Sequence, residues 1–305
     1  MSRALTFFLF VLLLFGACKP ASDTQREKPL IVATTSILAD GIQNLVGEKA
    51  EVIALMPAGV DPHLYKASVR DLDLLTSADL VVYHGLYLEG KMTEIFEKLT
   101  LRQNLIDVSD GIPQTDLIRS GPEAHSVDPH IWFDINLWSK ALTHASKELI
   151  QWKPEWKSII ESNSEVYFQK LKNLEQETRT KVNELKSKNQ VLVTAHDAFA
   201  YFGKAYGLEV YSLQGLSTLS EPGLRDLTEL IQIIQEHQVK AIFAEQTISP
   251  KALKAVANGA AEKNQLVQLA GPLYTDSLDA PDTPAGTYLG MFSTNLNIIY
   301  QNLLL

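Results

Sequence analysis

From Leu30 onward, short apolar runs of strand length alternate with longer segments whose apolar residues recur at helical spacing. In the first half the predicted strands span residues 30–36, 50–55, 80–84 and 104–109. After a long break they resume at 190–195, 209–214, 239–245 and 265–270. Strands that are separated by helices form βα units and parallel sheets. The pattern therefore predicts an α/β protein with two lobes, each built on a four-stranded, mostly parallel sheet.

The break between the two groups of strands has a pattern of its own. Pro154 suits the first turn of a helix, and the helix-length segment after it contains no Gly or Pro. Apolar and aromatic residues recur there mostly three, four or seven positions apart, among Glu and Lys. We expect one rigid amphipathic helix of about thirty residues, roughly 45 Å long, over residues 154–188. It divides the chain into an N-terminal lobe at 30–153 and a C-terminal lobe at 189–305.

The first thirty residues differ from the rest of the chain. A run of about a dozen mostly apolar residues ends in Gly-Ala-Cys at Cys18. This run is too short for a membrane-spanning helix and has the order of an export signal, so residues 1–17 are predicted to be removed. The pattern resembles a lipobox, except that Phe15 stands where Leu is usual. Cys18, the only cysteine, is then expected to carry a lipid, with residues 18–29 as a polar tether. Cleavage near Ala17 with an incidental cysteine is the alternative.

Composition and charge narrow the classes of partner. The chain has 305 residues, 46% of them hydrophobic and 21% charged, which is typical of a globular protein large enough for two domains. The formal net charge is −9, and no basic cluster interrupts this acidic balance. The charge therefore argues against a nucleic-acid partner and suits a cationic or neutral one.

The tetrapeptide Val-Asp-Pro-His occurs twice, ending at His63 and at His130. Proline fixes its own φ and biases the preceding residue towards extended conformations, so each His is expected on a stiff, non-helical turn. Both histidines lie beyond the carboxyl end of a predicted strand. In the second half, His196 directly follows the first predicted strand, and Asp276 lies just past the last one. Ligands of open α/β sheets bind outside these strand ends, so the four side chains are expected to face one another across a cleft.

Three imidazoles and one carboxylate form a complete ligand set for zinc. The same set is workable for manganese, which favours more oxygen ligands. A lone histidine at a strand end is more often a structural residue, but four candidates divided evenly between the two lobes favour a shared metal. We therefore predict one Zn²⁺ or Mn²⁺ per chain, bound by His63, His130, His196 and Asp276.

Further polar residues near the strand ends are candidates for supporting roles. His84 ends a predicted strand and is the main rival for a ligand position, but its segment also fits a strand-end turn. His125 lies in a polar loop and is expected to be solvated. Ligating histidines usually donate their second ring N–H to an acceptor. We expect such a supporting role, or contacts between the lobes, for Glu245, Ser217 and Glu221; for Glu245 the alternative is a cap on the following helix.

Two other functional classes fit the sequence less well. A catalytic zinc usually has three protein ligands and an open position for water, whereas a fourth ligand closes the site and suits holding and releasing. The chain has no His-Glu-x-x-His, no Gly-x-Ser-x-Gly and no phosphate-binding glycine loop. We therefore expect no enzymatic activity, with a zinc metallohydrolase as one alternative. A metal-independent surface adhesin is the other, and nothing in the sequence indicates an adhesive surface.

Several stretches, in order from about residue 30 to the C-terminus, resemble a known family. They are GVDPHLYKAS, DLDLLTSADLVVYHG, VDPHIWFD, VLVTAHDAFAYFGKAYGLEV, LQGLSTLSEPG, IFAEQTIS and GTYLGMFSTNL. They resemble the substrate-binding lipoproteins of bacterial zinc and manganese ABC importers (periplasmic solute-binding protein family 9), in particular the spirochaetal zinc/manganese-binding branch. The resemblance implies two α/β lobes bridged by a long helix, with one metal in the cleft. The ligands that it implies are His63, His130, His196 and Asp276.

The resemblance also implies a role and a location. It implies a monomeric, high-affinity receptor that delivers the metal to a cognate ABC permease. The receptor is attached to a membrane only through its lipid, and it faces the periplasm or the cell exterior.

Two departures from the family's patterns concern the identity of the metal. Zinc-specific members often carry a long His- and acid-rich loop before the second ligand, whereas the segment PQTDLIRSGPEAHS is short and holds a single His. Manganese-type members often have Glu at the third ligand position, where this chain has His196. Because three nitrogens and a carboxylate suit zinc better, the ligand chemistry favours zinc over manganese.

Overall fold

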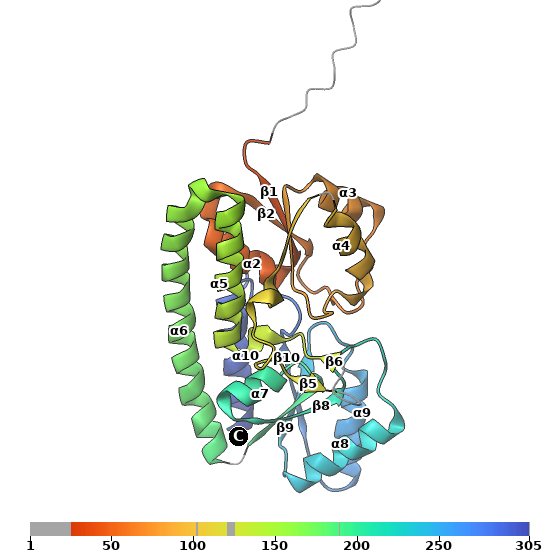
Figure 1. The fold of residues 1–305 in the computed structure, drawn as a ribbon. Helices are drawn as coiled ribbons and strands as arrows, with labels where there is room; N and C mark the ends of the chain where they lie inside the picture. The colour runs from red at the N-terminus through yellow and green to blue at the C-terminus, as the bar shows by residue number, and fades with distance from the viewer. Residues whose placement is uncertain (1–25, 102, 121–125, 189, 305) are drawn as a thin grey trace, which may run out of the picture.

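The computed structural model describes residues 26–101, 103–120, 126–188 and 190–304. Two α/β lobes lie one beyond the other, and a long helix runs along one side of both (Figure 1). This arrangement confirms the predicted fold class, with parallel strands in each lobe beside a long helix. The predicted export signal, Cys18 and His125 lie outside the described residues. Within the described residues, no helix combines the length and the apolar character that crossing a membrane requires.

The first lobe contains one parallel sheet with the strand order β2–β1–β3–β4. Its strands are β1 (Leu30–Thr35), β2 (Glu51–Met56), β3 (Leu80–Tyr83) and β4 (Asn104–Asp107). Strand β1 is buried at every position, as expected for a central parallel strand that is covered on both faces. The connecting helices are α2 (Ser36–Val46), α3 (Val69–Ser77) and α4 (Thr93–Leu99). Short 3-10 turns are η1 (Gly47–Lys49), η2 (Gly90–Met92) and η3 (Val108–Gly111).

The second lobe contains the other four predicted strands. They are β7 (Val191–His196), β8 (Glu209–Gln214), β9 (Ala241–Glu245) and β10 (Gln268–Leu273). Their hydrogen bonds form two parallel pairs, β7–β8 and β9–β10. Strand β7 lies beside β9, but the carboxylate of Glu245 accepts the backbone N–H groups of Ala195 and His196. The expected four strands are therefore present, but a side chain at the strand end joins the two pairs. The connecting helices are α7 (Ala200–Tyr206), α8 (Leu224–Glu236) and α9 (Lys251–Glu262).

The predicted long helix is confirmed. It begins with the 3-10 turn η6 (Pro154–Trp156) and continues as α6 (Lys157–Ser187), which has 31 residues. Proline is tolerated at this first turn because its missing N–H is one that has no partner within the helix. One stripe of α6 is buried, as its spacing of apolar residues predicts, and packs on α2, α5 (Ile135–Trp152) and α10 (Tyr288–Leu303).

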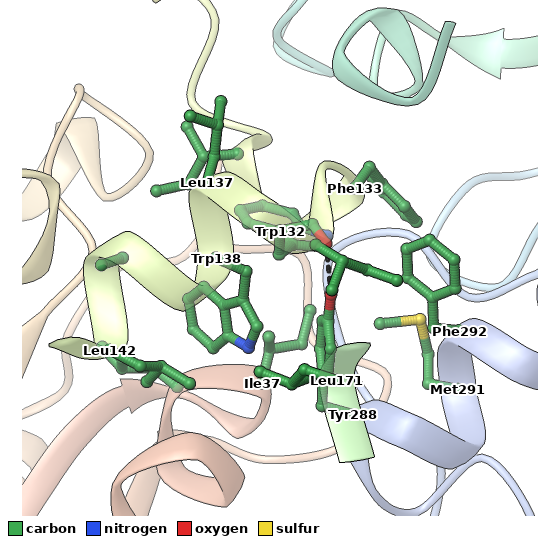
Figure 2. Packing of buried hydrophobic residues seen from close by; sticks show 14 of the residues in the cluster. Ile37, Trp132, Phe133, Leu137, Trp138, Leu142, Leu171, Tyr288, Met291 and Phe292 are labelled. Atoms are coloured by element: carbon green, nitrogen blue, oxygen red, sulfur yellow. Dashed lines mark hydrogen bonds between the residues drawn. The ribbon is translucent and has the colours of Figure 1, made fainter. Parts of the chain in front are cut away.

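The largest hydrophobic cluster extends across both lobes. It joins β1 and α2 of the first lobe to residues of α5, α6, α7 and α10. Figure 2 shows its centre, where Trp132, Trp138 and Tyr288 lie close to Leu171 of α6. The Tyr288 hydroxyl donates a hydrogen bond to the backbone carbonyl of Trp132 at 2.7 Å. Smaller clusters lie within each lobe alone. Because the central cluster crosses the junction, the lobes are packed against each other as well as linked by α6.

The connection from β4 to α5 contains short elements that the hydrophobic pattern did not predict. The two-residue strands β5 (Arg119–Ser120) and β6 (Ser126–Val127) pair antiparallel, and a 3-10 turn, η5 (Ile131–Phe133), follows them. Strands of two residues are too short to show an alternating pattern. This pair lies near the junction of the lobes, so His130, just after β6, is carried into the same region (Figure 1).

Candidate metal centre

Four side chains converge at the junction of the lobes, and they are the four that the sequence selected. One nitrogen or oxygen atom from each of His63, His130, His196 and Asp276 lies within 4.8 Å of the other three. The Nε2 atoms of His63 and His130 are 3.3 Å apart. The carboxylate oxygens of Asp276 lie 3.5 Å from Nε2 of His130 and 3.4 Å from Nε2 of His196. Each lobe thus contributes two donors to one small group.

The two Asp-Pro-His turns fold in the same way. Oδ1 of Asp61 accepts the backbone N–H of His63, and Oδ1 of Asp128 accepts that of His130, each at 2.8 Å. This is the bond of an Asx-turn, and the intervening proline stiffens it. These two aspartates are not among the residues predicted to support the site. The signal was present in the repeat itself, because each Asp stands two residues before its His.

The four candidate ligands are withdrawn from solvent. His130 and His196 have no exposed surface, Asp276 is 1% exposed and His63 is 5% exposed. Nε2 of His196 and both carboxylate oxygens of Asp276 make no hydrogen bond to any described residue. Buried polar atoms nearly always have a partner, so donor atoms that face one another without satisfying one another fit a cation held between them. Three nitrogens and a carboxylate are suited to a borderline divalent metal.

Two of the imidazoles are hydrogen-bonded through Nδ1 to carboxylates outside the four-donor group. Nδ1 of His196 lies 2.5 Å from Oε2 of Glu245, and Nδ1 of His130 lies 2.8 Å from Oδ1 of Asp128. With the proton on Nδ1 donated to the carboxylate, Nε2 keeps its lone pair for a metal. Glu245 thus lies where a supporting residue was expected. It does not cap the following helix, because the N-cap residue of α9 is Pro250, without a side-chain hydrogen bond.

Hydrogen bonds from the first lobe hold the segment that carries Asp276. The indole N–H of Trp132 donates to the Thr275 carbonyl at 2.9 Å. On the other side of Asp276, the Ser277 hydroxyl accepts the backbone N–H of Gly59 at 2.9 Å. Asp276 is therefore positioned by contacts on both sides, made with residues more than a hundred positions away along the chain.

Three other predicted site residues lie outside the four-donor group. His84 is buried, with Nε2 2.7 Å from the Pro129 carbonyl and its ring edge-on to Trp132, so it braces the second Asp-Pro-His turn. Ser217 lines a cavity of about 390 Å³ that reaches His63. Glu221 is exposed.

The electrostatic environment of the centre combines burial with a carboxylate. Burial lowers the pKa of His63 to about 3, so this imidazole is neutral at physiological pH. Burial also opposes a charge on His196, but the carboxylates of Glu245 and Asp276 raise its pKa above the ordinary value. Burial would raise the pKa of Asp276, but its interaction with the positively charged form of His196 keeps that pKa below the usual range. The centre therefore contains an ionised carboxylate, which attracts a cation.

Comparison with known proteins gives relatives over nearly the whole chain. Residues 31–302 match the family described as "ZnuA: Zinc-uptake complex component A periplasmic". The chain is 42% identical over 283 residues to the manganese-binding lipoprotein MntA of Bacillus subtilis, covering 93% of this chain and 92% of that protein. It is 38% identical over 285 residues to the zinc-binding protein TroA of Treponema pallidum, covering 93% and 91%.

A solved structure agrees with the fold as well. The structure of the periplasmic zinc-binding protein TroA from Treponema pallidum matches with a TM-score of 0.87 and 38% identity, over 90% of this chain and 99% of that one. The family resemblance noted in the sequence, including that to the spirochaetal branch, is thereby confirmed. The chain belongs to the family of the zinc-uptake complex component A, ZnuA.

Proposed function

We propose that this protein is an extracytoplasmic receptor that binds one Zn²⁺ or Mn²⁺ and delivers it, as a monomer, to an ABC permease. The observation that carries the proposal is the convergence of four buried donor groups, two from each lobe, within 4.8 Å of one another. The proposed ligands are His63, His130, His196 and Asp276. Membership of a family named for zinc uptake supports the transport role. We propose the lobe boundaries 30–153 and 189–305, with the helix between them.

The donor set favours holding a metal over catalysis. Four protein donors complete a tetrahedral shell, which leaves no position for an activated water. Each lobe supplies half of the shell, so separating the lobes breaks the site and offers a route for release. We therefore propose that the protein is not an enzyme, and that the metal is its cargo.

We propose zinc over manganese as the preferred metal. Three imidazole nitrogens and one carboxylate match the tetrahedral preference of zinc, whereas manganese favours more oxygen ligands. The relatives include one named for manganese and one named for zinc, so both metals belong in the test.

The test is elemental analysis of protein purified without added metal, followed by titration of the stripped protein with each metal. We expect one metal ion per chain and tighter binding of zinc. Two or more equivalents bound with similar affinity would contradict a single shared site. Tighter binding of manganese would reverse the proposed preference while leaving the receptor role in place.

We propose that the mature protein begins at Cys18 and is anchored by a lipid on that residue, facing the periplasm or the cell exterior. The relatives named as lipoproteins support this location. Replacing Cys18 by serine removes the acylated thiol, so the variant is expected to leave the membrane fraction for the soluble one. Fractionation of cells that produce each form measures this. If Cys18→Ser stayed with the membrane as the unchanged protein does, the lipid anchor would be refuted.

A further inference from the structure

Asp61 joins a ligand-bearing turn of the first lobe to a loop of the second. Its Oδ1 accepts the backbone N–H of His63 at 2.8 Å, and its Oδ2 accepts the hydroxyl of Thr218 at 2.6 Å. Thr218 lies in the loop at 215–223, between β8 and α8. A single carboxylate therefore connects the backbone of a candidate ligand with the opposite lobe.

The corresponding aspartate of the other turn is used differently. Oδ1 of Asp128 accepts both the backbone N–H and, through Nδ1, the ring N–H of His130. Oδ2 of Asp128 has no hydrogen-bond partner among the described residues. Both segments form the same Asx-turn through Oδ1 of the aspartate. They differ in what Oδ2 of that aspartate contacts. In Asp61 that oxygen makes a bond between the lobes, and the bond to Thr218 is not needed to form the turn.

The loop that carries Thr218 also lines a cavity that reaches His63. The lining of the cavity of about 390 Å³ includes His63, Leu86 and Tyr87 of the first lobe and Leu216, Ser217 and Leu219 of this loop. His63 is the most exposed of the four candidate ligands. A metal that leaves through this cavity passes His63 and the loop.

We propose that the hydrogen bond from Thr218 to Asp61 is a latch that keeps the loop at 215–223 closed over this cavity and slows loss of the bound metal. The inference rests on the proposed receptor function and adds positioning residues to it. Neither Thr218 nor Asp61 belongs to the four-donor group, so the latch acts through His63 and the loop. A hydrogen bond to a carboxylate is stronger than one between neutral groups. Because this bond must break before the loop can move away from the cavity, it slows the opening of the loop.

The test compares Thr218→Val with Thr218→Ser. Valine keeps the shape of the side chain and removes the hydroxyl, whereas serine retains it. Protein loaded with zinc is mixed with excess chelator, and the rate of zinc release is followed by stopped flow. We expect release to be about tenfold faster in Thr218→Val, with the association rate and the stoichiometry of one unchanged, and close to the original rate in Thr218→Ser. Thr228→Val, on the exposed face of α8, is the matched control and should leave the release rate unchanged.

A second readout separates a latch from a general loss of stability. In the metal-free protein, amide exchange at His63 and in the loop at 215–223 should be faster in Thr218→Val than in Thr218→Ser, while exchange in the strands of both lobes is the same in the two variants. Equal release rates in these two variants would overturn the latch. If the unchanged protein took up neither zinc nor manganese, the proposed function would fail instead. Should Thr218→Val not fold, Thr218→Ala provides the same comparison.

Discussion

Replacing Asp276 by alanine is expected to lower the affinity for zinc by about 100- to 1,000-fold. Structural zinc sites bind with about 10–16 kcal/mol, so one of four ligands accounts for roughly 2.5–4 kcal/mol. Asp276 is also the only carboxylate of the four donors, and both of its oxygens lack other partners among the described residues. Competition with a chelator of known affinity measures the change.

The control for this variant is Asp282→Ala, which removes an exposed carboxylate from the same part of the chain. It should leave the affinity unchanged, because an exposed side chain contributes little to a buried site. Circular dichroism of both metal-free variants checks that the fold is retained. An affinity of Asp276→Ala equal to that of the control would remove Asp276 from the ligand set.

Replacing Glu245 by glutamine is expected to weaken metal binding about 10- to 100-fold with one metal still bound per chain. The carboxylate accepts N–H groups of Ala195 and His196 through one oxygen and Nδ1 of His196 through the other. Glutamine has a single acceptor oxygen. When that oxygen accepts the backbone N–H groups, the NH₂ group of the glutamine faces Nδ1 of His196. Because NH₂ can only donate, the imidazole proton moves to Nε2, where it competes with the metal.

Glu221→Gln is the matched control for this substitution, because the same chemical change is made on an exposed side chain. Isothermal titration of both variants gives affinity and stoichiometry together. If Glu245→Gln bound no metal at all, Glu245 would have to be a direct ligand. An unchanged affinity would limit its role to joining β7 and β9.

The local pattern of the chain predicts the longer helices and strands and the four candidate ligands. The four strands of the parallel sheet in the first lobe agree with the predicted ranges to within two residues, because buried parallel strands are continuous apolar runs. The donors were found because they share one local property, a position at or beyond the carboxyl end of a strand, where an open α/β sheet binds its ligands. The second Asp-Pro-His turn can be identified from the repeat alone, whereas the two-residue strands β5 and β6 before it are too short to show a pattern.

The residues that support the ligands were less accessible to the same reasoning. Glu245 was placed near the centre because it ends a strand, but its bonds to both the backbone and the ring of His196 span 49 residues of sequence. Asp61 and Asp128 have a local spacing to each His, but only the structure shows which groups their second carboxylate oxygens meet. Ser217 and Glu221 were selected together from one loop, and only the structure separates a cavity-lining side chain from an exposed one.

The amino-acid sequence by itself determined two α/β lobes, the long helix between them and the four donor side chains, because periodicity and strand ends are properties of neighbouring residues. Only the tertiary structure decided that the lobes share a core, that the second sheet is divided at Glu245, and that Thr218 reaches Asp61. Thr218 and Asp61 are 157 residues apart, and which loops meet across the junction depends on how the helices α5, α6 and α10 pack. That packing is a sum over many distant contacts, which no local pattern contains.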